Sequence, residues 1–321
     1  MAVTMNEQEK RLTELKKEVP TRGFKRHPII LKDICDLAPE LQSPAVTELA
    51  AHEPLRTIIA FPAQIHRGWH YVSKQALLFT PTEVIHLVAS IWPDQEPEVT
   101  LLRGSDLIYM NVTLILLYGY LEVVAHGCGS PARLNVEFNT VAWYQLSSPL
   151  MKLLEASKPS SSIWTDTAIC SPAAQQAIEK LPLKFSNGLQ IYGLLPGEGL
   201  EDLVFQAGTW KPRLLFFRKA LTANTLLMIT TNYVVVIKEE LEISHGWILT
   251  YIPRNCIGGI QNQPLSLLNV LTVHLKRGEQ TAEYKLLLDN ASTQDWRKKW
   301  IGHGLQWEDL PMADRSSSMR A

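Results

Sequence analysis

One eleven-residue pattern occurs twice in this chain of 321 residues. The first copy, LLFTPTEVIHL, begins at Leu77, and the second, LMITTNYVVVI, begins at Leu227. In each copy two apolar runs flank a polar turn, which begins at Thr80 or Thr230, and this pattern predicts a β-hairpin. Similar segments, IAFPAQ and LVFQAG, precede the two copies. Because self-similarity of this kind marks a repeated structural unit, we predict one β-rich domain used twice in tandem.

Length and composition limit the classes of protein that the chain can belong to. A chain of this length with 46% hydrophobic residues can bury two cores, since domains commonly hold about 100 to 150 residues. The net charge of -1 lacks the positive surplus that a general nucleic-acid binder needs, so we expect no nucleic-acid partner. The four cysteines form no CxxC pair, which favours reduced thiols. The polar N-terminus lacks an apolar export signal, and we predict a cytoplasmic protein.

Alternation of apolar and polar residues is clearest near the C-terminus. Residues 271–275 and 284–288 each alternate and flank a turn at Arg277-Gly278-Glu279, which predicts an antiparallel hairpin with one core face. Residues 107–125 are apolar but include polar positions such as Asn111, and we interpret them as successive strands. The fold class is therefore predicted as mainly β with closing helices.

A helix is predicted to close each β-domain. Ser148 can cap the first of these helices, which would begin at Pro149. Ser292 and Asp295 have capping-box spacing at the start of the second helix. In that helix Trp296 lies four residues before another tryptophan, so both indoles share one face.

Pro, Ser and charge patterns divide the chain into five parts. We predict an N-terminal helical or irregular segment at residues 1–50, a first β-domain at 51–157, a linker with a short helix at 158–193, a second β-domain at 194–308 and a disordered tail at 309–321.

Three segments of the second β-domain together resemble a known superfold. They are LPGE from Leu195, NTLLMITTNYVV from Asn224 and YIPRNCI from Tyr251. Over residues 194–301 their order resembles the pleckstrin-homology-like superfold, particularly the bacterial PH-like and GRAM-like domains. The repeated eleven-residue pattern extends the resemblance to residues 56–155. The resemblance implies two tandem PH-like β-barrels or sandwiches, each capped by a C-terminal helix, and a noncatalytic role in binding lipids, peptides or other proteins.

The densest basic stretch of the chain is the candidate binding surface. Lys211, Arg213, Arg218 and Lys219 lie close to Trp210 in the sequence. Such a mixture of charge and aromatic surface suits an anionic partner, a phosphorylated peptide or an acidic membrane. The alternative is a solvated strand face whose long side chains cover apolar neighbours. If the surface binds a partner, charge reversal at Arg213 and Arg218 should abolish partner capture.

Motifs for metal binding or catalysis are not found. His66 and His70 are interpreted as exposed loop histidines, and His126 and Cys128 as parts of a β-turn, because two ligands fall short of a structural zinc site. Nucleophile-elbow, Walker and HExxH motifs are absent from the sequence. We therefore expect no metal and no cofactor, and we expect that the chain is not an enzyme.

Taken together, these features predict a noncatalytic binding or scaffold protein that recognises a protein or peptide partner. One alternative is a peripheral module that binds anionic lipid at a membrane surface. A less favoured alternative is an enzyme with an unfamiliar site between the two β-domains.

Overall fold

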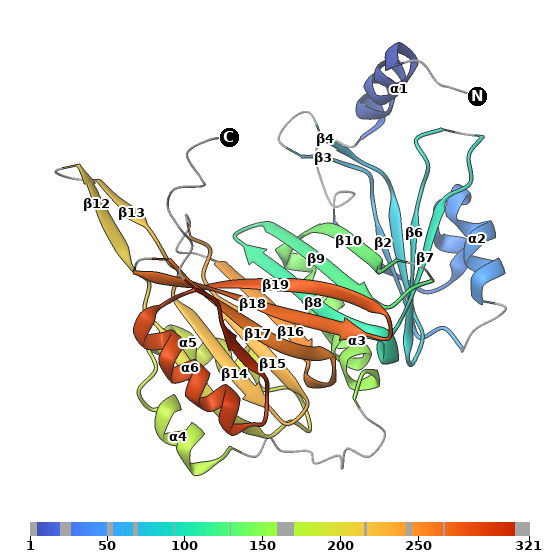
Figure 1. Cartoon of the computed structure of the whole chain (residues 1–321). Helices are drawn as coiled ribbons and strands as arrows, with labels where there is room; N and C mark the ends of the chain where they lie inside the picture. Colours follow the sequence, from blue (N-terminus) through green and yellow to red (C-terminus); the bar gives the residue numbers. More distant parts are fainter. Residues whose placement is uncertain are drawn as a thin grey trace. The chain divides into compact units, whose positions relative to one another are not determined.

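The chain is mainly β, as the sequence predicts (Figure 1). The computed structural model describes residues 5–19, 27–49, 54–66, 70–92, 94–128, 130–158, 170–214, 217–241, 246–265 and 267–311. It divides into two compact units. The first contains Met1–Leu107, Leu117–Tyr120 and Ala132–Ser157, and the second contains Ile108–Leu116, Leu121–Pro131 and Lys158–Ala321.

The first unit is built on an open antiparallel sheet with the order β1-β2-β5-β6-β7. Its strands are β1 (Ile29–Leu31), β2 (Thr57–Phe61), β5 (Gln75–Phe79), β6 (Glu83–Val88) and β7 (Glu98–Arg103). The hairpin predicted from the first copy of the repeat is confirmed as β5 and β6. Between β2 and β5, the short strands β3 (Gln64–His66) and β4 (His70–Val72) pair with each other.

Helix α2 (Pro39–Leu49) covers part of one face of this sheet. Leu41 and Ala45, four residues apart, are buried in a cluster with alternate residues of the sheet. A 3₁₀ turn, η2 (Ile34–Asp36), precedes the helix. Helix α1 (Met5–Glu18) precedes both in the sequence and lies in the N-terminal segment that is predicted as helical or irregular.

Helix α3 (Trp143–Ala156) begins earlier than the sequence predicts. The predicted start at Ser148 and Pro149 is wrong, because both residues lie inside the helix. The chain enters it through a 3₁₀ turn, η4 (Thr140–Ala142), which the side chain of Asn139 caps. Proline removes one helical N–H. The helix nevertheless continues, and four leucines on it are buried: Leu146, Leu150, Leu153 and Leu154.

A seven-stranded sheet has the order β10-β9-β8-β16-β15-β14-β11. Its strands are β8 (Leu107–Ile115), β9 (Tyr118–Ala125), β10 (Ala132–Asn139), β11 (Leu200–Gln206), β14 (Thr225–Thr230), β15 (Tyr233–Lys238) and β16 (Gly246–Pro253). The second predicted hairpin is confirmed as β14 and β15. Within the second unit β16 pairs with β8, and Tyr251 lies opposite Met110. Strand β8, which is distant from β16 in the sequence, is therefore part of the same sheet.

A four-stranded sheet, β19-β18-β17-β20, completes the second unit together with its helices. Its strands are β17 (Ile257–Leu265), β18 (Leu268–Arg277), β19 (Gln280–Asp289) and β20 (Trp307–Asp309). The hairpin predicted near the C-terminus is confirmed as β18 and β19. The described part of the predicted tail includes Asp309, which ends β20, whereas residues 312–321 lie outside the described residues.

The core of the second unit draws on both of these sheets and on helix α6 (Asn290–Gly302). Val236 of β15 and Val273 of β18 belong to the same buried cluster as Trp296 and Trp300 of the helix. Among the described strands the sheets stay open. The unit therefore packs as a sandwich closed by a helix, and the predicted barrel alternative does not form.

The start of α6 differs from the predicted capping box at Ser292. The cap is Asp289, whose Oδ1 accepts a hydrogen bond of 2.7 Å from the backbone N–H of Ser292. The second unit also contains α4 (Pro172–Ile178), α5 (Leu183–Gly188), η5 (Leu189–Gly193), η6 (Arg254–Cys256) and the ribbon of β12 (Trp210–Leu214) and β13 (Phe217–Ala220). The short helix predicted within residues 158–193 is confirmed by α4, whose N-cap is Ser171: its hydroxyl accepts a hydrogen bond from the N–H of Ala174.

Candidate functional site

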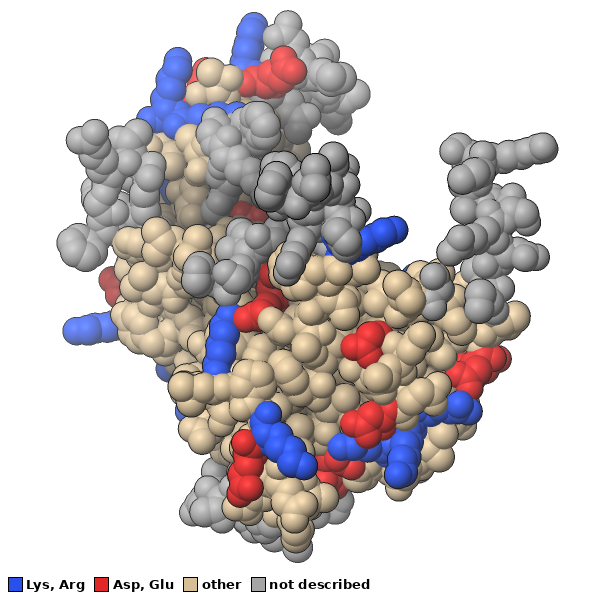
Figure 2. All heavy atoms as spheres, turned by 90° about the vertical axis from the view of Figure 1, so that its left-hand side faces the viewer, with Lys and Arg blue, Asp and Glu red and all other residues tan. Residues whose placement is uncertain are grey.

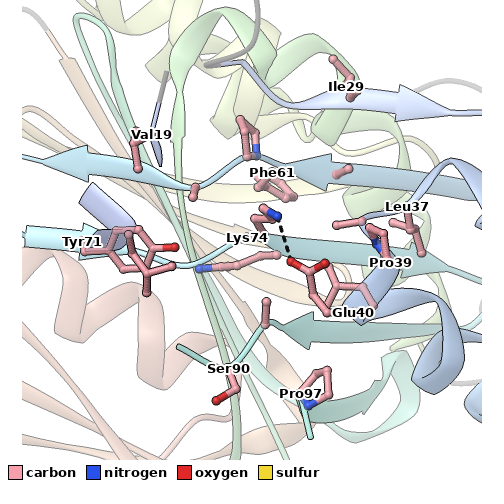
Figure 3. A pocket seen from close by; sticks show the side chains of 18 of the residues that line it. Val19, Ile29, Leu37, Pro39, Glu40, Phe61, Tyr71, Lys74, Ser90 and Pro97 are labelled. Carbon is pink, nitrogen blue, oxygen red and sulfur yellow. Dashed lines mark hydrogen bonds and ion pairs between the residues drawn. The ribbon is translucent and has the colours of Figure 1, made fainter. Parts of the chain in front are cut away.

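The first unit contains a cavity of about 950 Å³ whose lining extends from the edge strand β1 across to the segment between β6 and β7 (Figure 3). Its walls come from α1, from the segment β1–η2–α2, from the turn after β2, from the approach to β5 and from the chain after β6. This volume is typical of a ligand-binding pocket, which spans about 300 to 1,000 Å³. No single stretch of sequence contains the site.

Most of the cavity wall is apolar. Six of its residues come from three separate segments: Leu15, Val19, Ile29, Leu31, Leu37 and Phe61. The wall continues the apolar face that α2 covers elsewhere, since Leu37, Leu41 and Ala89 belong both to the buried cluster and to the cavity. The uncovered part of that face is available to an apolar ligand.

One ion pair lies on the cavity wall. Nζ of Lys74 donates a hydrogen bond of 2.9 Å to Oε1 of Glu40, and the two side chains are 48% and 40% exposed (Figure 3). Burial opposes the ionisation of Glu40, but the hydrogen bond from Lys74, a backbone hydrogen bond and the positive charge of Lys74 together lower the pKa of the carboxyl. The two charges compensate each other, so this wall attracts neither sign strongly.

Helix α1 is held against the same cavity by a polar contact. Nε of Arg11 donates a hydrogen bond of 3.0 Å to the carbonyl oxygen of Ile91. Leu15 and Val19, one turn apart, are buried on the cavity side of this segment. The charged α1 is therefore part of the wall because its apolar stripe faces the cavity.

The edge strand β1 gives the cavity a second means of recognition. Ile29 and Ile30 are 50% and 53% exposed, which is unusual for isoleucine in a strand. Among the described strands, β1 pairs with β2 and ends the sheet. An edge strand presents unpaired backbone groups to which another strand can add.

The sequence did not single out this site. The sequence predicts the segment from Pro28 to Leu49 as irregular with one or two short helices, because prolines interrupt its apolar positions. The available signal was the apolar triplet from Ile29 to Leu31, whose length fits a short edge strand.

The basic stretch predicted as a binding surface forms the ribbon β12–β13. Its register places Lys211 opposite Lys219 and Pro212 opposite Arg218, while Arg213 lies on β12 one residue further along. Trp210 is 58% exposed and Lys211 is also exposed. The side chains of residues 212–219 lie outside the described residues. The backbone of all five predicted residues is therefore brought together, and binding there stays a prediction.

The other candidate residues lie beside a hairpin turn or on a loop. His66 and His70 are opposite each other in the β3–β4 hairpin, and residues 67–69 and both histidine side chains lie outside the described residues. His126 and Cys128 are exposed on a loop that Gln280 holds. In the part of the chain that the structure describes, no three His, Cys, Asp or Glu side chains gather as a metal site requires.

No protein-family model and no curated protein matches this chain. None of the described helices is both long enough and apolar enough to cross a membrane.

Proposed function

We propose that this chain is a noncatalytic binding protein whose first unit recognises an extended segment of a protein or peptide partner. The segment would add to the edge of β1 and place apolar side chains in the cavity. In this mode of recognition, backbone hydrogen bonds supply affinity and pockets for alternate side chains supply specificity.

The observation that carries this proposal is the position of β1 on the cavity wall. Ile29 and Leu31, two residues apart on the strand, both line the cavity, and Ile29 is half exposed. Residues two apart in a strand lie on the same face. A strand that pairs with β1 would place its own alternate side chains over this cavity.

The test is a selection of displayed random 12-residue peptides against the full chain, followed by affinity measurements on the enriched peptides. Ile29→Thr should weaken binding by about fivefold, because it removes apolar contact worth about 1 kcal/mol. The matched control is Val99→Thr on β7, which is 36% exposed at the opposite edge of the sheet and does not line the cavity. Enrichment of no peptide, or equal weakening by both variants, would contradict the proposal.

The ribbon β12–β13 supports a second candidate function, which is contact with an anionic membrane surface. Its support is the exposed indole of Trp210 beside the exposed Lys211, a pairing found where proteins meet lipid headgroups. Co-sedimentation with phosphatidylserine vesicles tests this function. Binding that falls with salt and with Trp210→Ala would support it, and no co-sedimentation at low salt would remove it.

A further inference from the structure

The two faces of the edge strand β1 border cavities of different chemistry. Ile29 and Leu31 line the large apolar cavity, whereas Ile30 lines a second cavity of about 240 Å³. Successive strand residues point to opposite faces of a sheet. The two cavities therefore lie on opposite sides of the same strand.

The small cavity is basic and rich in hydrogen-bond donors. Arg56, just before β2, and Lys152, on α3, contribute its charges, and Thr57, Tyr144 and Ser148 contribute hydroxyl groups. No acidic residue is found among its described lining residues. Arg56 and Lys152 are exposed, and the ion pairs between described residues involve neither of them.

This arrangement contrasts with the charges on the large cavity. There, Lys74 is compensated by Glu40 at 2.9 Å. In the small cavity the positive charge of Arg56 and Lys152 has no such compensation on its wall. A carboxylate would gain charge-assisted hydrogen bonds in the small cavity, and an apolar side chain would bury more apolar surface in the large one.

We infer that the partner segment alternates apolar and acidic side chains, so that every second residue enters the apolar cavity and the residue between them presents a carboxylate to Arg56 and Lys152. This inference rests on the proposed function, because it requires a strand that pairs with β1. A strand in that position exposes alternate side chains to the two faces of the sheet, and therefore to the two cavities.

The test uses the tightest peptide from the selection described above, resynthesised with glutamine or lysine at each acidic position that lies between two apolar residues. Fluorescence anisotropy with the full chain measures each affinity. We expect the glutamine peptide to bind about three to ten times more weakly than the parent, and the lysine peptide more weakly still. The preference for the acidic residue should decrease as salt increases.

A double variant assigns this preference to the small cavity. Arg56→Gln with Lys152→Gln should bring the parent and glutamine peptides to nearly equal affinity, while Lys298→Gln, an exposed lysine on α6 that lines neither cavity, should preserve the difference. Circular dichroism checks that the variants fold.

The outcomes separate the two proposals. Peptides that depend on Ile29 but contain no acidic residue between apolar ones, or that bind equally well with glutamine there, would overturn the alternation and leave the proposed function standing. Failure to enrich any peptide would overturn both. A preference that survives the double variant would also overturn the role assigned to Arg56 and Lys152.

Discussion

Nε2 of His86 lies 2.9 Å from Oε1 of Gln75, and both side chains are buried, with 5% and 8% of their surface exposed. Because an amide oxygen accepts hydrogen bonds, the ring donates through Nε2–H. Burial lowers the pKa of His86 to about 4, so the imidazole is neutral at physiological pH. Gln75 also lines the large cavity, and His86 therefore helps to position a residue of the candidate site.

The first prediction concerns acid stability. The unfolded chain binds a proton at His86 with a pKa near 6.5, whereas the folded chain resists protonation until about pH 4. The contribution of neutral His86 to the free energy of unfolding is therefore fully present above pH 6.5 and is lost as the pH falls towards 4. The loss amounts to about 2 kcal/mol between pH 7.5 and 5. Urea denaturation of the wild type and of His86→Gln should show a smaller loss in the variant. Equal losses in the two proteins would contradict this account.

A second prediction concerns the buried carboxylate of Glu198 in the PGE turn. It accepts hydrogen bonds from Thr230 Oγ1 at 2.9 Å and from the backbone N–H of Asn232 at 2.8 Å, and it lies 2.9 Å from Nζ of Lys158. The Lys158 side chain is only 6% exposed, so Glu198→Ala leaves a buried ammonium without its carboxylate partner, although Nζ still donates to the carbonyl oxygen of Pro196 at 3.0 Å. We expect a loss of about 3 to 5 kcal/mol in the free energy of unfolding.

The double variant Glu198→Ala with Lys158→Met should recover part of that loss, because it removes the orphaned charge along with its partner. Glu279→Ala, at an exposed turn between β18 and β19, is the control and should change the stability by less than about 0.5 kcal/mol. A loss of similar size in the single and double variants would argue against the ion pair as its cause.

A third prediction compares two glycines at the end of α6. Gly304 has φ of +73° and its N–H bonds to the carbonyl oxygen of Ile301, whereas Gly302 is the last helical residue and has no positive φ. An added Cβ meets no atom within 4 Å at either position. Gly304→Ala should therefore cost about 1 kcal/mol through backbone strain alone, and Gly302→Ala should be neutral or stabilising. Thermal unfolding of the two variants measures the difference.

A fourth prediction concerns the phenol of Tyr284, which packs partly buried against the core of the second unit, at alkaline pH. Burial raises its pKa to about 12, although its hydrogen bond of 3.0 Å with the hydroxyl of Thr250 acts in the opposite direction. Tyr284 therefore stays protonated at pH 11 in the folded chain and ionises on unfolding, and the stability that it contributes is lost as the pH rises above 10. Tyr284→Phe should reduce the rise in tyrosinate absorbance on unfolding at pH 11. An unchanged rise would contradict the assignment.

Local patterns predicted several parts of the fold well. Apolar runs on both sides of a polar turn located the hairpins β5–β6 and β14–β15, whose strands are buried on both faces. Alternation of apolar and polar residues located β18–β19, because a strand with one buried face needs a period of two. The two hairpin turns of the repeat also have the same internal hydrogen bond. In each turn the threonine hydroxyl, of Thr80 or Thr230, accepts from the backbone N–H of the residue three positions later. Helix starts were less predictable, because several polar residues can serve as caps, and Asp289 rather than Ser292 does so in α6.

The sequence by itself determined the β-rich class, the hairpins and the closing helix with its buried tryptophans, because each depends on residues close together in the chain. Only the tertiary structure decided that β8 pairs with β16, where Asn111 lies opposite Thr250, and that five separate segments wall one apolar cavity. The physical reason is that such pairings depend on contacts between residues far apart in the sequence. Their stability is decided by the entropy of loop closure and by packing, and neither leaves a periodic pattern in the local sequence.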